Sequence, residues 1–324
     1  MDPLAVVIVN YRTADLACQS VARLAPELVR RPGSVVRVVD NDSGDGSLER
    51  IARFVEEQGF GGWASVVPAG RNGGFAAGNN VALRGLLAEG RYGAFLLLNP
   101  DAWVLPGALD ALVERMEGDP RIGIVGSRLE NPDGSLQRSA FRFPSARTEL
   151  ERAVSLGPVT RLLPGWAVSF PPADEAHRCD WVAGASLLVR REVLEQVGLL
   201  DEEYFLYFEE VDFCARVARA GWTCWHEPRS RVVHLEGQAT GVTDPRNATR
   251  PLPPYWFDSR RRFLLRNLGP AATAAADVSW MAGRVLGAPG RLLRRALTGK
   301  VDPMPRRMFS DFARNSVFMR GFRC

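Results

Sequence analysis

Five short apolar runs divide the opening 126 residues of this 324-residue chain, at residues 4–9, 35–39, 66–67, 95–98 and 122–126. Between these runs, apolar residues recur at the three- and four-residue spacing that is typical of helices. Strands that alternate with helices predict an α/β fold with a parallel, doubly wound sheet and right-handed crossovers.

The run Ala-Phe-Leu-Leu-Leu at residues 94–98 predicts a strand buried on both faces, in the middle of the sheet. Asn99 and Pro100 follow it, and proline has no N–H with which to continue a central ladder. Asp101 is therefore expected just past the carboxyl end of this strand, where open α/β sheets bind their ligands.

The second half of the chain has a weaker pattern. Residues 128–178 are rich in Pro, Arg and Ser, and they predict loops and a short hairpin with a turn at 131–134. A strand is expected at 181–189, a helix begins near Glu209, and an alternating strand ends at His234.

Composition limits the class of protein. The chain is 46% hydrophobic and 24% charged, as in ordinary soluble globular proteins, and its net charge of +4 is mild. No nucleic-acid-binding motif is present, so nucleic acid is not an expected partner. The five cysteines lack CxxC spacing, and neither a signal peptide nor an apolar run of roughly 20 residues is evident. We expect a cytoplasmic protein, or one peripheral on the inner face of the cell membrane.

Two carboxylates at the ends of predicted elements are candidates for ligand binding or catalysis. Asp40 follows the second predicted strand, where an acid often binds a ribose or a base. On the helix near Glu209, the angular spacing groups Glu210 with apolar residues, which would raise its pKa toward that of a general base. The alternative is that Glu210 only complements the helix dipole. Glu209 and Asp212 lie on the other side, which predicts a solvated or salt-bridged face.

Asp101 and His234 are candidates to hold a divalent cation. A carboxylate oxygen and an imidazole nitrogen, completed by phosphate oxygens and water, suit Mn²⁺ or Mg²⁺. The glycine-rich segment 71–80 matches neither GxGxxG nor the P-loop. Its glycines indicate a loop that closely approaches a ligand.

Five segments in fixed order carry a family resemblance. The chain resembles a family 2 glycosyltransferase of the GT-A fold, in its rhamnosyltransferase-like branch, over residues 4–268. The segments are residues 7–11, 39–47, 72–80, 98–102 and 205–212. The resemblance implies one domain at 1–268, with a nucleotide-binding half at 1–126 and an acceptor and catalytic half at 127–268, and a basic extension at 269–324.

The resemblance also implies a reaction and its site. It implies metal-dependent, inverting transfer from a dTDP- or UDP-sugar, with L-rhamnose from dTDP-rhamnose as the first expectation, to a saccharide or polyprenyl-linked acceptor in cell-envelope polysaccharide synthesis. Glu210 would be the catalytic base, and Asp101 and His234 would bind the cation. The implied nucleotide-sugar-binding residues are Asn10, Asp40, Arg71, Asn72, Gly73, Gly74, Asn99, Asp101, Trp181, Gly184 and Ala185. The chain departs from the family pattern at Asn99, where the first acid of Asp-x-Asp is usual, and at Glu210, where Asp is usual.

Two other functions stay open at this stage. A sugar-nucleotide nucleotidyltransferase would be expected to carry a glycine-rich loop after its first strand, but residues 10–13, Asn-Tyr-Arg-Thr, contain no glycine. A non-catalytic sugar-nucleotide-binding module is favoured only by Glu210 standing in place of Asp.

The C-terminal segment is strongly basic, with 14 Lys and Arg against four Asp from residue 257 onward. Within 291–297, leucines occupy one helical face and arginines the other. A basic amphipathic helix suits an anionic membrane surface. The alternative is a terminal helix packed on the core or on a second copy in a homodimer.

Overall fold

A computed structural model describes residues 3–235, 237, 251–299 and 308–322. The chain forms two compact units. The described residues of unit 1 are 3–141, 171–235 and 237, and those of unit 2 are 142–170, 251–299 and 308–322. The domain limits expected at 126/127 and 268/269 stay predictions.

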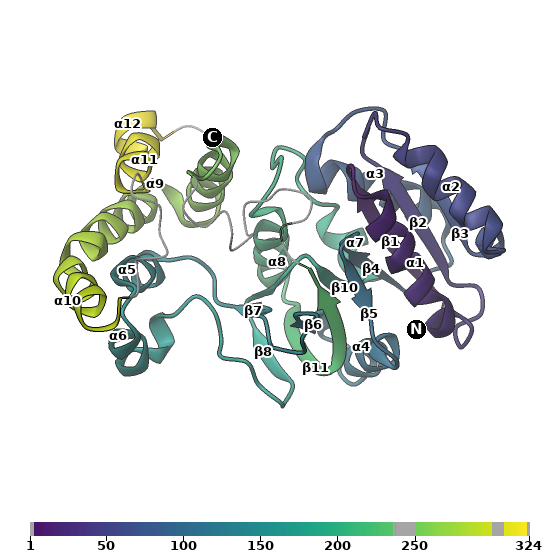
Figure 1. The fold of residues 1–324 in the computed structure, drawn as a ribbon, viewed down its shortest axis with the longest axis horizontal. Coiled ribbons are helices and arrows are strands. Elements are labelled where there is room, and N and C mark those ends of the chain that lie inside the picture. The colour runs from purple at the N-terminus through teal and green to yellow at the C-terminus, as the bar shows by residue number, and fades with distance from the viewer. Residues whose placement is uncertain (1–2, 236, 238–250, 300–307, 323–324) are drawn as a thin grey trace. The chain divides into compact units, whose positions relative to one another are not determined.

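The first four apolar runs form adjacent parallel strands of unit 1, in the order β3-β2-β1-β4. The strands are β1 (Leu4–Asn10), β2 (Val35–Asp40), β3 (Ala64–Pro68) and β4 (Ala94–Leu98). The helices that connect them are α1 (Ala14–Leu28), α2 (Ser47–Glu57) and α3 (Gly74–Glu89), with a 3₁₀ turn at Phe60–Gly62 (Figure 1). All seven residues of β1 are buried, as expected for a strand covered on both faces.

The rest of the sheet is mixed. β10 (Ser186–Arg190) lies antiparallel between β4 and β6 (Ile122–Glu130), and β11 (Thr223–His234) runs parallel to β6. Two short strands pair antiparallel with β11: β5 (Ala102–Val104) and β8 (His177–Cys179). The helices of this half are α4 (Ala108–Glu117), α7 (Arg191–Val197) and α8 (Glu209–Arg219). The predicted α/β class with a mostly parallel sheet is confirmed. β4 and β6 run in the same direction, but they are not neighbours because the antiparallel β10 lies between them.

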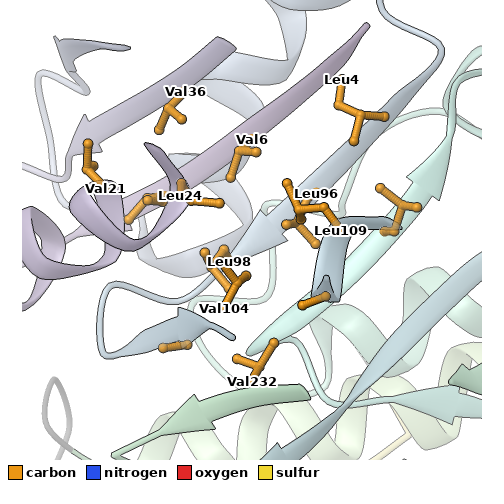
Figure 2. Close-up of a cluster of buried hydrophobic side chains, with 14 of the residues drawn as sticks. Leu4, Val6, Val21, Leu24, Val36, Leu96, Leu98, Val104, Leu109 and Val232 are labelled. Atoms are coloured by element: carbon orange, nitrogen blue, oxygen red, sulfur yellow. The ribbon is translucent and has the colours of Figure 1, made fainter. Parts of the chain in front are cut away.

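Alternate residues of the central strands pack against opposite helices. Figure 2 shows Leu4 and Val6 of β1 in one buried cluster with Leu24 of α1 and Leu109 of α4. On the other face, Val9 meets Gly78 of α3 so closely that a Cβ on residue 78 would lie 2.6 Å from Val9 Cγ1. Each fully buried aliphatic side chain contributes about 1.5–3 kcal/mol, which makes this region the main source of stability in unit 1.

Residues 128–178 contain more helix than the sequence predicts. The turn at 131–134 is confirmed, because Gly134 N–H donates to the Asn131 carbonyl. The loops expected after it are wrong where α5 (Ala146–Val154), α6 (Gly157–Leu162) and a 3₁₀ turn (Pro164–Trp166) form. Ser145 and Thr148 make a capping box that begins α5. Strands β7 (Ala140–Phe141) and β9 (Trp181–Val182) form a separate two-stranded sheet.

Unit 2 is helical, which confirms the helical C-terminal region. Its other helices are α9 (Pro254–Leu286), α10 (Ala288–Thr298), α11 (Met308–Asn315) and α12 (Val317–Arg320). Gly269, with φ of 80°, interrupts α9 just before Pro270. The rings of Trp280 and Phe312 stack with centroids 3.7 Å apart in the core of this unit. Among the described residues, no helix is long and apolar enough to span a bilayer.

Candidate active site

The ends of β1 and β2 carry a closed polar network. Asn10 and Asp40 are register partners, and Asn10 Nδ2 donates to Asp40 Oδ1 over 2.8 Å. Ser43 donates twice to the same carboxylate, from Oγ to Oδ1 at 2.6 Å and from its backbone N–H to Oδ2 at 3.1 Å. All three residues are buried. The network therefore fixes the Asp40 carboxylate at the carboxyl edge of the sheet, where a ligand of the parallel strands is expected.

The glycine-rich segment is tied to the same edge. Asn41 Nδ2 donates to Asn72 Oδ1 at 2.9 Å and to the Gly74 carbonyl at 3.1 Å. Gly74 has φ of +80°, and a Cβ there would lie 1.7 Å from the Phe205 carbonyl oxygen. Only glycine fits this position, since both the conformation and the close approach exclude a side chain. Asn72 and Gly74 thus lie next to the end of β2, as the sequence predicts.

The Arg71 side chain next to this segment is 76% exposed, with its guanidinium 3.9 Å from Glu202. At this exposure and distance the pair contributes little to stability. Arg71 is consequently able to contact an anionic ligand without breaking a strong ion pair.

A second cluster joins β4, β5 and β11. Pairing of β5 with β11 sets His234 opposite Ala102, and His234 Nε2 lies 3.5 Å from Asp101 Oδ1. The same Nε2 is 3.5 Å from Asn99 Nδ2. The Asn99 N–H donates to the Ala185 carbonyl at 3.0 Å. Four residues that the sequence marks for this site therefore lie together at one sheet edge.

Asp101 and His234 fit a divalent cation as a pair of ligands. Two neighbouring ligands of an octahedral cation, each about 2.1 Å from it, lie about 3 Å apart. The observed 3.5 Å between Asp101 Oδ1 and His234 Nε2 is close to that spacing. In the described part of the chain, no group of three or more His, Cys, Asp or Glu side chains is placed to hold a metal ion. The fitting set is one oxygen and one nitrogen, with the remaining positions for phosphate and water.

Glu210 lies beside the backbone that supports Asn99. A Cβ built on Gly184 would lie 3.7 Å from Glu210 Cβ and 3.6 Å from the Phe75 ring. Immediately before α8, Tyr207 and Phe208 both have positive φ, 67° and 69°. Such conformations cost about 1–3 kcal/mol each in non-glycine residues and are concentrated at functional sites.

The acids at the start of α8 are in an apolar environment. Burial raises the pKa of Glu210 to about 7, although backbone N–H groups at the helix start offset part of the effect. Burial and the nearby Glu210 charge raise the pKa of Glu209 well above its ordinary value. The Oε2 atom of each acid has no hydrogen-bond partner among the described residues. Perturbed carboxyl groups of this kind are typical of catalytic sites.

The face of this helix predicted to be solvated or salt-bridged is buried and salt-bridged, not solvated. Glu209 and Asp212 are buried, and Asp212 is ion-paired with Arg216 at 2.9 Å. Arg216 also donates to the carbonyls of Val197 and Leu199, so the segment before α8 covers this side of the helix. The angular spacing correctly pairs Asp212 with Arg216 but does not show what packs over them.

Trp181 lies on β9, three residues before Gly184. Its ring stacks on Phe141 of β7, with centroids 4.1 Å apart and an interplanar angle of 15°. The stacked pair is half-buried. It gives the segment leading to Gly184 a rigid aromatic surface.

The comparisons with known proteins identify the family. The Glycosyl transferase family 2 model matches residues 5–170, just over half of the chain. An N-acetylglucosaminyl-diphospho-decaprenol L-rhamnosyltransferase from Mycobacterium tuberculosis is 33% identical over 254 residues, which cover 74% of this chain and 78% of that protein. This chain belongs to glycosyltransferase family 2. It is a glycosyltransferase, and its predicted similarity to the rhamnosyltransferase-like branch is confirmed.

One further relative and two solved structures extend the similarity. A low-salt glycan biosynthesis hexosyltransferase from Haloferax volcanii is 26% identical over 274 residues, which cover 82% of this chain and 76% of that protein. A mannosyltransferase from Pyrobaculum calidifontis, solved with GDP-Man and Mn²⁺, has a TM-score of 0.54 at 17% identity and covers 96% of this chain and 84% of its own. GalNAc-T7, solved with UDP, GalNAc and Mn²⁺, has a TM-score of 0.55 at 17% identity, covering 81% of this chain and 48% of its own. At such identities these structures show the fold alone, which confirms the GT-A prediction.

Sequence reasoning missed three residues of this candidate site. Ser43 and Asn41 hold Asp40 and the glycine-rich segment, and the turn sequence Asp-Asn-Asp-Ser at 40–43 was the available signal. Gln137 contacts His234 from a segment with no pattern to mark it. The roles of the individual predicted residues stay predictions.

Proposed function

We propose that this enzyme transfers L-rhamnose from dTDP-rhamnose to a polyprenyl-linked saccharide, with inversion at the anomeric carbon, in cell-envelope polysaccharide synthesis. The observation that carries the reaction class is the position of Glu210 next to Gly184. The following residue, Ala185, accepts the backbone hydrogen bond of Asn99, which belongs to the cluster of Asp101 and His234. The L-rhamnosyl group and the lipid-linked acceptor are supported by the Mycobacterium tuberculosis relative, an N-acetylglucosaminyl-diphospho-decaprenol L-rhamnosyltransferase. The two alternatives, a nucleotidyltransferase and a binding module, have no support from these comparisons.

Glu210 is the proposed general base. Its carboxylate takes the proton of the acceptor hydroxyl while that oxygen attacks the anomeric carbon. The bond from this carbon to the diphosphate oxygen breaks, and the nucleoside diphosphate leaves with the bonding electrons. A pKa of about 7 suits this role, because the base is partly ionised near neutral pH and still binds a proton firmly.

The other predicted residues hold the donor. Asn10, Asp40 and the segment 71–74 would line the nucleoside, with Arg71 toward the diphosphate. Trp181, Gly184 and Ala185 would shape the pocket between donor and acceptor. Asp101 and His234 would hold Mn²⁺ or Mg²⁺, which, when bound, neutralises charge on the leaving diphosphate.

A donor panel tests the proposal. The purified enzyme is incubated with a short-chain N-acetylglucosaminyl-diphospho-polyprenol and with dTDP-rhamnose, UDP-N-acetylglucosamine or GDP-mannose, with Mn²⁺ or with EDTA. We expect a product heavier by one deoxyhexosyl residue, with dTDP-rhamnose and Mn²⁺ only. Transfer from another donor would refute the sugar, undiminished transfer in EDTA would refute the cation, and no transfer from any donor would refute the proposed reaction.

We also propose that α10 binds an anionic bilayer, where a lipid-linked acceptor is found. Leu292, Leu293 and Leu297 are 67%, 60% and 75% exposed, so they are not packed on the protein core. Arg295 is exposed on the same helix, which contains no acidic residue. Arg291 has a different role, because it donates to the carbonyls of Ala153 and Val154. An exposed leucine face beside uncompensated positive charge complements anionic lipid.

Vesicle binding tests this surface. The full chain should co-sediment with vesicles containing phosphatidylglycerol and not with pure phosphatidylcholine, and a Leu292→Ser and Leu293→Ser double variant should lose most of this binding. A matched control is Val29→Ser, another exposed apolar residue. If the double variant instead converts a dimer to a monomer in sedimentation velocity and binds vesicles normally, the surface is a homodimer interface and the membrane proposal is wrong.

A further inference from the structure

Gln137 contacts His234 with both ends of its side-chain amide. Gln137 Nε2 lies 2.8 Å from the His234 backbone carbonyl, and Gln137 Oε1 lies 3.1 Å from His234 Nδ1. A backbone carbonyl only accepts hydrogen bonds, so the amide end that faces it must be the NH₂ group. The oxygen end therefore faces the imidazole, and the orientation of the amide follows from chemistry.

The position of Gln137 is itself supported. Its Nε2 also donates to Asn131 Oδ1 at 2.7 Å, and its backbone N–H donates to the Leu129 carbonyl at 2.9 Å. Asn131 in turn donates to Ser135 Oγ within the 131–134 turn region. The hairpin after β6 thus holds the amide in place through side-chain and backbone contacts.

We infer that Gln137 is a positioning residue that holds neutral His234 as its Nδ1–H tautomer, with Nε2 turned toward Asp101. An amide oxygen can only accept, so the nitrogen that it contacts must carry the proton. Nε2 then carries a lone pair that faces the Asn99 amide NH₂ group at 3.5 Å and lies 3.5 Å from Asp101 Oδ1. This arrangement prepares the imidazole as a metal ligand, and outer partners of this kind typically change metal affinity by about 10–100-fold. The part that concerns the cation rests on the proposed function.

The tautomer can be measured without any metal or substrate. Long-range ¹⁵N–¹H NMR of the metal-free, full-length protein distinguishes the two ring nitrogens of His234, with the signal assigned by a His234→Gln variant. We expect the Nδ1–H tautomer in the wild type and in Gln137→Glu, which keeps an acceptor beside Nδ1. Gln137→Leu should shift the ring toward the Nε2–H form. A wild-type ring in the Nε2–H form would overturn the inference, whatever sugar the enzyme transfers.

Cation affinity is the second readout. Mn²⁺ binding in the presence of dTDP, followed by electron paramagnetic resonance, should weaken by about 10–100-fold in Gln137→Leu. Gln58→Leu, at an exposed glutamine of the same unit, should leave it unchanged. Unchanged Mn²⁺ affinity in Gln137→Leu would overturn the positioning role. If the wild type shows the Nδ1–H tautomer but binds no Mn²⁺, the tautomer inference stands and the cation of the proposed function is refuted.

Discussion

Glu149 in α5 and Glu209 in α8 are 2% and 4% exposed, but their surroundings differ completely. Glu149 is ion-paired with Arg152 at 2.9 Å and with Arg260 at 3.2 Å, and Arg260 also binds Asp277 at 2.7 Å. Burial by itself would raise the pKa of Glu149, but the two arginine charges lower it below its ordinary value. Glu149 therefore stays ionised, and Arg260 joins it in α5 to Asp277 in α9.

The first two acids of α8 lack such partners, whereas Asp212 of the same helix is ion-paired with Arg216. Glu209 and Glu210 are adjacent, and one carboxylate oxygen of each has no hydrogen-bond partner within the described residues. Burial raises the pKa of both groups. The contrast teaches that burial alone does not mark a functional acid in this protein. Burial without a compensating cation does mark such an acid. A buried, unpaired carboxylate destabilises the fold, and groups of this kind are concentrated at catalytic sites.

The largest expected effect is on catalysis. Glu210→Gln keeps the shape of the side chain and removes the proposed base, so kcat should fall by about 10²–10⁴-fold. Initial rates at saturating donor and acceptor measure the change. Glu192→Gln, at an exposed acid on α7, should retain wild-type activity. Transfer by Glu210→Gln at the wild-type rate would show that another group takes the proton.

Removal of Arg260 should destabilise the contact between α5 and α9. Arg260→Met leaves Glu149 and Asp277 buried with one cation fewer, which should destabilise the α5 and α9 packing by about 3–5 kcal/mol. Hydrogen exchange followed by mass spectrometry should show lost protection in peptides from these two helices. The exposed Arg295→Met should change the free energy of opening by less than about 0.5 kcal/mol. Equal protection in both variants would mean that the network contributes no net stability.

The contributions of Glu210 and Glu149 to the free energy of unfolding should depend on pH with opposite signs. The pKa of Glu210 rises from 4.5 to about 7 on folding, so its contribution to stability is full below pH 4.5 and is lost as the pH rises through 7. Glu149 has a lowered pKa, so its contribution is present above pH 4.5 and is lost as the pH falls. Thermal unfolding between pH 4.5 and 8 should therefore show Glu210→Gln gaining a few degrees in Tm over the wild type as the pH rises. A constant difference across this range would contradict the shifted pKa.

The smallest expected effect is at the surface of α10. Leu293→Ser should change the free energy of unfolding by less than about 0.5 kcal/mol, because the side chain is already 60% exposed. Leu96→Ala, in the fully buried strand β4, should cost about 2–5 kcal/mol. Chemical denaturation of both variants gives the comparison. A large loss of unfolding free energy in Leu293→Ser would show that this face of α10 is covered in solution.

The sequence by itself determined the local elements of the first half of the chain and the polar residues at their ends. Uninterrupted apolar runs identified the first four strands, since a strand covered on both faces excludes polar side chains. Because parallel strands end at one edge, residues such as Asp40 and Asp101 could be assigned to that edge from the pattern alone. The apolar neighbours of Glu210 on its helix were also sufficient to predict a raised pKa.

Only the tertiary structure decided which segments meet. It inserted β10 beside β4, bound Arg216 to the segment before α8, packed α5 against α9, and brought Gln137 to His234. These contacts join residues that are distant in the chain. The pattern of apolar and polar residues indicates which positions favour burial, but not which segment buries each of them. The order of the strands and the contact of Gln137 with His234 therefore depend on tertiary packing, which no local segment specifies.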